Sequence, residues 1–152
     1  RLSESDAKGD SSFSAPTSTV FGYNGSNNYV VYCFRSIKGY SKIGTYTGNG
    51  STNGTFTYTG FKPAWIISKR TDASADWHMY DNKREPDNPL SLTIFPNGSS
   101  GEVSGDALDF LSNGFKQRNT GAEQNADGGT YVYMAFAENP FVSSKGVPTT
   151  AR

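Results

Sequence analysis

Cysteine and histidine are almost absent from this chain of 152 residues, which contains one of each, Cys33 and His78. A single cysteine cannot form an internal disulfide, and its place in an apolar stretch predicts a buried structural thiol. One cysteine and one histidine far apart in sequence also lack the ligand spacing of a zinc site. We therefore predict no metal centre and no cofactor.

Neither sign of charge is in excess, because 14 Lys and Arg residues balance 14 Asp and Glu residues. A nucleic-acid partner is not expected, since a surface that binds nucleic acid needs a clustered basic excess. No apolar run approaches the ~20 residues that span a bilayer as a helix. We therefore expect no membrane insertion.

Aromatic residues are abundant although hydrophobic residues are few. Hydrophobic residues make up 34% of the chain, Phe, Trp and Tyr alone make up 14%, and there are 17 glycines. Aromatic side chains pack well on pleated faces, while glycine shapes turns. No segment shows a 3.6-residue period longer than about two turns. The pattern predicts an all-β fold, an antiparallel β-sandwich (jelly-roll or concanavalin-like) of about eight to nine short strands.

Segments bounded by Gly, Asn or Pro mark the expected strands. They are Ser41–Thr47, Thr55–Thr59, Ala64–Lys69, Trp77–Asp81, Leu92–Phe95, Ala107–Leu111, Gly114–Arg118 and Thr130–Ala137. The first two flank a Gly- and Asn-rich turn at residues 48–54 and are expected to pair as a hairpin. Ala64–Lys69 is expected to be a central strand, and Glu102–Gly105 a loop.

Two strand-like stretches have related sequences. Tyr131–Ala137 (YVYMAFA) and Tyr29–Arg35 (YVVYCFR) match at their first, second and sixth positions. Both faces of the earlier stretch are apolar, which predicts a central, covered strand. A strand that recurs at a domain-sized interval suggests that one unit is used more than once. We predict an irregular segment at 1–39 that ends in the last strand of a truncated preceding unit, a complete β-sandwich unit at 40–141 and a polar tail at 142–152.

One region combines aromatic faces with planar polar groups, as sugar recognition requires, at positions near loops. The candidate ligand-binding residues are Arg70, Asp72, Trp77, Tyr80, Asp81, Lys83 and Arg84. A structural interpretation of the same residues stays open. In that interpretation Trp65 and Trp77 belong to the core. Asp81 and Arg84 then form a surface ion pair that contributes at most ~1 kcal/mol.

Catalytic interpretations have less support. His78 lies near Asp81, but no nucleophile motif accompanies them, so His78 is expected to be a polar residue on a half-exposed strand. A glycosidase would need two carboxyls held about 5–10 Å apart across a cleft. The acidic candidates for that role are Glu102, Asp106 and Asp109. The alternative calcium ligands are Asp106 and Asp109, or Asp127 with neighbouring carbonyls, but they lack EF-hand spacing. We predict no enzymatic activity and no catalytic residue.

Several stretches together resemble a domain repeated in structural proteins of marine tailed bacteriophages, which are described as tail-fibre-like or virion-surface proteins. They are YVVYCFRSIKGYSKIGTYTGNGS, YTGFKPAWIISKRTD, WHMYD, DFLSNGFK, GGTYVYMAFAENPF and the ending GVPTTAR. The resemblance implies a non-enzymatic β-sandwich exposed on a virion, with a lectin-like form as an open alternative.

The expected function follows from this resemblance. It implies a tail-fibre-type protein of the phage virion surface that presents an adhesive surface for host attachment. The alternative is an architectural module that decorates a capsid or tail and has no host ligand. Expected partners are other virion proteins, a host-surface glycan and further copies of the chain, with a trimer favoured.

Overall fold

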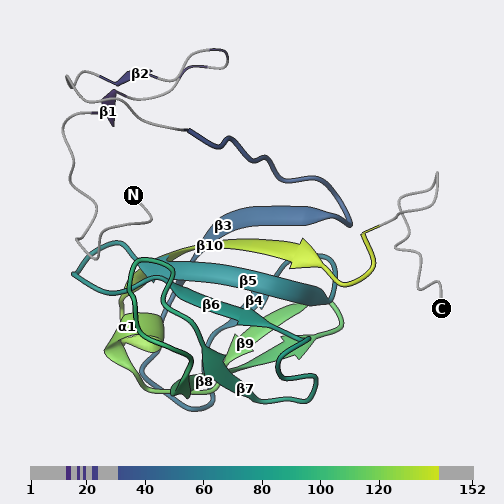
Figure 1. Ribbon diagram of the computed structural model, residues 1–152, viewed down its shortest axis with the longest axis vertical. Coiled ribbons are helices and arrows are strands. Elements are labelled where there is room, and N and C mark those ends of the chain that lie inside the picture. The colour runs from purple at the N-terminus through teal and green to yellow at the C-terminus, as the bar shows by residue number, and fades with distance from the viewer. Residues whose placement is uncertain (1–12, 15–16, 18, 20–21, 24–30, 141–152) are drawn as a thin grey trace.

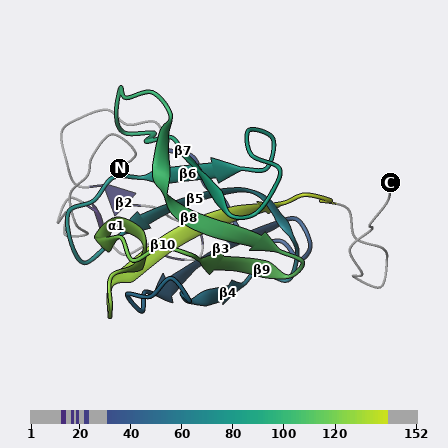
Figure 2. The ribbon, with the colours of Figure 1, turned by 90° about the horizontal axis from the view of Figure 1, so that it is seen from below.

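Two antiparallel β-sheets pack face to face in the computed structural model (Figure 1). Figure 2 shows the two layers from below, with the helix at one end of the strands. The structure describes residues 13–14, 17, 19, 22–23 and 31–140. The predicted all-β antiparallel sandwich is therefore confirmed, and among these residues each sheet has four strands.

Several strands that are consecutive in sequence belong to different sheets. The first sheet has the order β3 (Ser41–Thr47), β10 (Thr130–Ala137), β5 (Pro63–Arg70) and β6 (His78–Asp81). The second sheet has the order β4 (Phe56–Tyr58), β9 (Gly114–Gln117), β8 (Val103–Leu111) and β7 (Leu90–Thr93). A separate two-stranded sheet joins β1 (Phe13–Ser14) to β2 (Gly22–Tyr23).

The central position of β10 follows from its alternating side chains. Tyr131, Tyr133 and Ala135 point inward and are buried, whereas the residues between them are partly exposed on the outer face. On either side β10 pairs with β3 and β5. The predicted strand Ala64–Lys69 corresponds to β5, which lies between β10 and β6 and is central as expected.

Aromatic rings fill the space between the two sheets. Phe115 of the second sheet meets Tyr46 and Tyr133 of the first edge to face, with ring centroids 5.7 and 5.1 Å apart. Tyr46 also stacks on Tyr131 at 4.8 Å. Offset and edge-to-face pairs of this kind add to the stabilisation from buried apolar area. The high aromatic content of the sequence is therefore largely a property of the core.

A short helix, α1 (Ala122–Asn125), closes one end of the sandwich. The hydroxyl of Tyr131 donates to the carbonyl of Ala122 (2.8 Å) and accepts from the amide of Ala126 (2.7 Å). These bonds hold the helical turn against β10. Among the described residues, no helix is both long and apolar enough to cross a membrane.

The predicted hairpin of β3 and β4 is wrong, because the two strands belong to opposite sheets. β3 pairs with β10 and β4 pairs with β9. The Gly- and Asn-rich stretch between them is a loop that crosses the end of the sandwich. Gly48 is required there, because a Cβ at this position would lie 2.2 Å from the carbonyl oxygen of Ala126. The predicted loop Glu102–Gly105 is also wrong, since most of it is the start of β8.

The predicted strand at Tyr29–Arg35 is wrong for residues 31–35, which the structure describes. Residues 29 and 30 lie outside the described residues. Residues 31–36 form no strand, and Cys33 is exposed rather than buried. Tyr32 is 78% exposed and Phe34 57%. The apolar character of this segment therefore does not arise from burial within one chain.

Pairing between this segment and β3 begins and then stops. Ile37 and Ser41 form an isolated bridge across the turn. At the next position the Ser36 hydroxyl accepts from the Ile43 amide (3.0 Å) and donates to the Ile43 carbonyl (3.4 Å). A side chain thus replaces the backbone ladder on this edge of β3. The other edge of β3 pairs with β10, which lies between β3 and β5.

Candidate functional site

The residues predicted as one binding site lie at two ends of the same strand pair. β5 and β6 are antiparallel, with Ser68 opposite His78 and Trp65 opposite Asp81. Residues that follow β5 therefore lie near the start of β6, and residues that follow β6 lie near the start of β5. Arg70, Asp72 and Trp77 are at one end; Asp81, Lys83 and Arg84 are at the other.

Tyr80 has to be removed from the predicted site. Its side chain is fully buried, and its hydroxyl donates to the carbonyl of Asp106 (2.8 Å). Burial raises the pKa of Tyr80 beyond its ordinary range, and the charge of Asp106 adds to that rise. Tyr80 is a core residue that no external ligand can contact.

At the first end, Arg70 is held by its own neighbours. Its Nε donates to Asp72 (2.7 Å) and its Nη1 donates to the carbonyl of Ala122 in α1 (3.0 Å). The hydrogen bond from Arg70 lowers the pKa of Asp72. Trp77 is partly exposed, and its amide donates to Asn97 (2.8 Å). This end is a folded loop whose polar groups are already engaged.

At the second end, Arg84 bridges two carboxylates. Its Nε lies 2.6 Å from Asp81 and its Nη1 lies 2.6 Å from Glu102. Burial would raise the pKa of Asp81, but the hydrogen bonds from Arg84 and from the Lys83 amide outweigh it, so that the pKa is lowered. The ion pair of the structural interpretation, Asp81 with Arg84, is thus present. Lys83 is exposed beside it.

His78 forms a polar cluster that sequence reasoning missed. The expected half-exposed position is wrong, since only 1% of the side chain is accessible. Its Nε2 donates to the Glu123 carboxylate (2.8 Å), and its Nδ1 lies 3.8 Å from Asp106. Burial raises the pKa of Asp106; His78 opposes that rise and Glu123 adds to it. The cluster joins β6, β8 and α1, so we assign it a structural role.

The three acidic candidates for hydrolysis do not converge. Glu102 binds Arg84, Asp106 lies beside His78, and Asp109 lies 3.4 Å from Arg118. In the part of the chain that the structure describes, no group of three His, Cys, Asp or Glu side chains could hold a metal ion.

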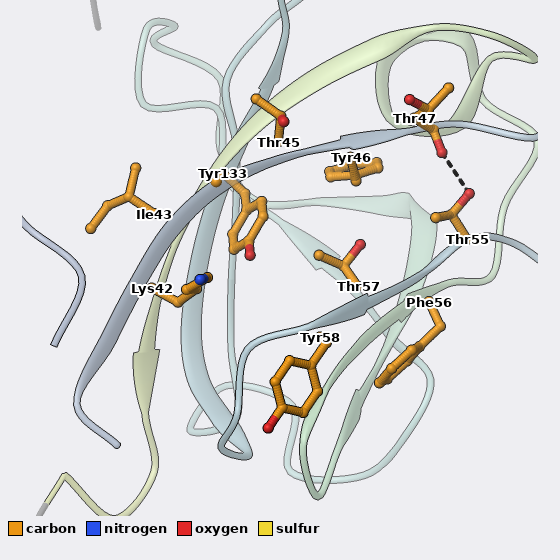
Figure 3. Close-up of a pocket in the computed structure, with 11 residues that line it drawn as sticks. Lys42, Ile43, Thr45, Tyr46, Thr47, Thr55, Phe56, Thr57, Tyr58 and Tyr133 are labelled. Carbon is orange, nitrogen blue, oxygen red and sulfur yellow. Dashed lines mark hydrogen bonds between the residues drawn. The ribbon is translucent and has the colours of Figure 1, made fainter. Parts of the chain in front are cut away.

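A groove between β3 and β4 offers a different site. The two strands are edge strands of opposite sheets, so the groove runs along an open side of the sandwich (Figure 3). The Thr55 hydroxyl donates to the Thr47 carbonyl (2.6 Å) and ties the strands together at one end. The cavity has a volume of about 510 Å³. It is lined by Lys42, Ile43, Gly44, Thr45, Tyr46, Thr47, Thr55, Phe56, Thr57, Tyr58 and Tyr133.

Two hydroxyl groups lie near the floor of the groove. Thr57 is only 7% exposed, and its Oγ1 has no hydrogen-bond partner among the described residues and is closed to solvent. Thr57 and Tyr133 both point into the space between the strands, whereas Tyr58 points away (Figure 3). Burial raises the pKa of Tyr133. Because Tyr133 lines the groove, its hydroxyl is the group that we consider for contact with a ligand.

Gly44 makes room for the Tyr133 ring. Gly44 and Tyr133 are directly opposite in the pairing of β3 with β10. A Cβ on Gly44 would lie 3.0 Å from both Cε1 and Oη of Tyr133. The absence of a side chain at Gly44 therefore lets the phenol extend across β3 to the groove.

Sequence reasoning did not identify the groove, although alternation along this strand puts Phe56 and Tyr58 on one face. These side chains do share a face, and it is the solvent-exposed one, since Tyr58 is 64% exposed. Thr57 consequently points inward. The sequence pattern that could have indicated the groove is the alternation in β4. Its aromatic side chains point outward and its threonine hydroxyl points inward.

The fold and the groove define a β-sandwich module with one open, hydroxyl-lined side. The chain belongs to the family described as a domain of unknown function (DUF7483), whose profile matches residues 2–140. This match includes both Tyr29–Arg35 and Tyr131–Ala137 and runs across the unit boundary that the sequence analysis places after residue 39. No curated protein matches the chain, and no solved structure matches it.

Proposed function

We propose that this chain is a tail-fibre-type protein of a phage virion surface and that it binds a host-surface glycan in the β3–β4 groove. The virion setting comes from the resemblance described above. The observation that carries the ligand is the Tyr133 hydroxyl, which points into an open groove (Figure 3). Sugars offer several hydroxyl groups close together, and such groups pair well with threonine and tyrosine hydroxyls.

The lining of the groove supports a polar ligand. Lys42 and Tyr133 bring polar groups to it, and Tyr58 and Phe56 add exposed aromatic surface. Pockets for small molecules combine apolar walls with a few polar groups that fix orientation. The competing proposal is an architectural module without a host ligand.

Tyr133→Phe tests this function, because it removes the hydroxyl that points into the groove and keeps the ring in the core. Affinity for the glycan should fall about tenfold, as expected for one lost hydrogen bond. The free energy of unfolding should change by less than about 1 kcal/mol. The measurements are urea unfolding and titration of a glycan selected on an array of host polysaccharides.

Thr57→Val is the matched control. Its Oγ1 is buried without a partner and closed to solvent, so this variant should gain about 1 kcal/mol of stability and keep its affinity. Trp77→Ala and Arg84→Ala test the site predicted from sequence and should bind normally. If the wild-type chain binds no glycan, or if Tyr133→Phe binds as well as wild type, the architectural proposal is favoured.

We also propose a homo-oligomer, with a trimer favoured, whose interface is the apolar segment 31–37 together with the outer face of the first sheet. Phe34 packs edge to face on Phe136 of that face, with ring centroids 6.1 Å apart, and the centroid of Trp65 lies 5.7 Å from that of Phe136. Tyr32 and Phe34 remain largely exposed. A contiguous apolar patch of this kind marks an interaction surface, and a second copy supplies the same apolar surface to cover it.

The double variant Tyr32→Ser and Phe34→Ser should dissociate this oligomer. Both side chains are exposed in the single chain, so the fold should be retained while the apolar cover for a neighbouring copy is lost. Light scattering should give a mass of several times 16.4 kDa for the wild type and 16.4 kDa for the variant. Lys38→Ser, an exposed control directly after this segment, should remain oligomeric. A monomeric wild type would refute the proposal.

A further inference from the structure

We propose that the groove recognises the carboxylate of an acidic sugar; this inference rests on the proposed glycan-binding function. Two polar groups reach the groove from different strands: the Lys42 ammonium from β3 and the Tyr133 hydroxyl from β10. Figure 3 shows both side chains beside the same space.

The pairing of β3 with β10 places Lys42 beside Tyr133. Lys42 is opposite Ala135 and Gly44 is opposite Tyr133 in this ladder. Side chains two positions apart share a face, so Lys42 lies on the same inward face as Gly44 and adjacent to the Tyr133 ring. Ala135 is small, and it leaves space beside the lysine stem. The ammonium group and the phenol thus belong to one part of the groove.

Lys42 has no ion pair among the residues that the structure describes, in contrast to Lys62, which pairs with Glu138 at 3.0 Å. Within the described lining of the groove, Lys42 is the one charged residue, and no Asp or Glu opposes it. A cation next to a hydroxyl group that can donate a hydrogen bond favours an anion. A charge-assisted hydrogen bond is roughly twice as strong as a neutral one.

The donor set fits a carboxylate better than a phosphate or a sulfate ester. A carboxylate carries one negative charge on two oxygens, which match one ammonium and the hydroxyl of Tyr133. Phosphate sites typically use several cations or a set of backbone amides at a helix or loop. In the described part of the groove one cation is available, and both flanking elements are strands.

The test compares an oligosaccharide of glucuronic acid with its carboxyl-reduced counterpart by titration calorimetry at low and high salt. Both probes have the same ring hydroxyls and differ only in the carboxylate. The acidic probe should bind the wild-type chain about tenfold more tightly, and salt should weaken only the acidic probe. Lys42→Met should remove this preference, so that the variant binds the two probes equally.

Two control variants and a third probe complete the test. Lys42→Arg should keep most of the preference, and Lys38→Met, an exposed lysine outside the groove, should keep all of it. Equal binding of the two probes by the wild type, or an acid preference that survives in Lys42→Met, overturns the carboxylate assignment and leaves the glycan function standing. Tighter binding of a sulfated neutral oligosaccharide overturns it as well. If neither uronic probe nor any neutral glycan binds, the proposed function itself is refuted.

Discussion

Phe115→Ala is expected to lower the free energy of unfolding by about 3–5 kcal/mol, the range for truncation of a buried phenylalanine. Phe115 is completely buried and is the point at which the second sheet meets the aromatic residues of the first. Its ring contacts Tyr46 and Tyr133 edge to face, and these pairs contribute beyond the buried area. The small side chain would leave a cavity between two rigid sheets that cannot close to fill it.

Urea unfolding followed by tryptophan fluorescence measures this loss, and Phe56→Ala is the matched control. Phe56 is on the neighbouring strand β4 but is 44% exposed, so its truncation should cost less than about 1 kcal/mol. If Phe115→Ala does not fold, Phe115→Leu should still be measurable, with a smaller loss. Equal losses for Phe115→Ala and Phe56→Ala would show that the two sheets do not pack as described.

Asn125→Ala is expected to cost about 3 kcal/mol, although it removes little apolar surface. The side chain is completely buried at the end of α1. Its Nδ2 donates to the carbonyls of Asn119 (2.7 Å) and Ser51 (2.8 Å), and its Oδ1 accepts from the amide of Asn49 (3.1 Å). Alanine would leave several of these backbone groups without a partner, and each such buried group costs about 1–3 kcal/mol.

The same substitution should weaken binding in the groove. Asn125 fixes the loop that connects β3 to β4, and this loop sets the spacing of the two strands. Asn53→Ala is the control, because Asn53 belongs to the same loop but is exposed. Thermal unfolding and glycan titration of both variants are the measurements. A loss for Asn125→Ala no larger than that for Asn53→Ala would contradict the role assigned to Asn125.

Local pattern was sufficient for most strands because alternation and turn residues act over a few positions. Ser41–Thr47 and Thr130–Ala137 are strands with the predicted bounds, and six further expected strands are present with shifted ends. Pairing was less predictable. The hairpin of β3 and β4 was wrong because a long loop can either reverse a chain within one sheet or cross to the other, and composition does not distinguish these outcomes.

The candidate site shows the same limit. Arg70 and Arg84 are close in sequence to aromatic residues, yet antiparallel pairing of β5 and β6 puts them at opposite ends. Lys42, Thr57 and Tyr133 are far apart in sequence and meet only because three strands from two sheets converge on one groove. Tyr80 and His78 differ from expectation because the second sheet and α1 cover the inner face of an edge strand.

The sequence by itself determined that this protein is an all-β antiparallel sandwich, since turn chemistry and side-chain alternation are local properties of the chain. It also showed that Tyr29–Arg35 and Tyr131–Ala137 have the same apolar character. Only the tertiary structure decided that one of these is a central strand while the described part of the other is exposed, because burial depends on which partner strands are available. The position of the groove was decided in the same way, by the pairing of strands across the two sheets.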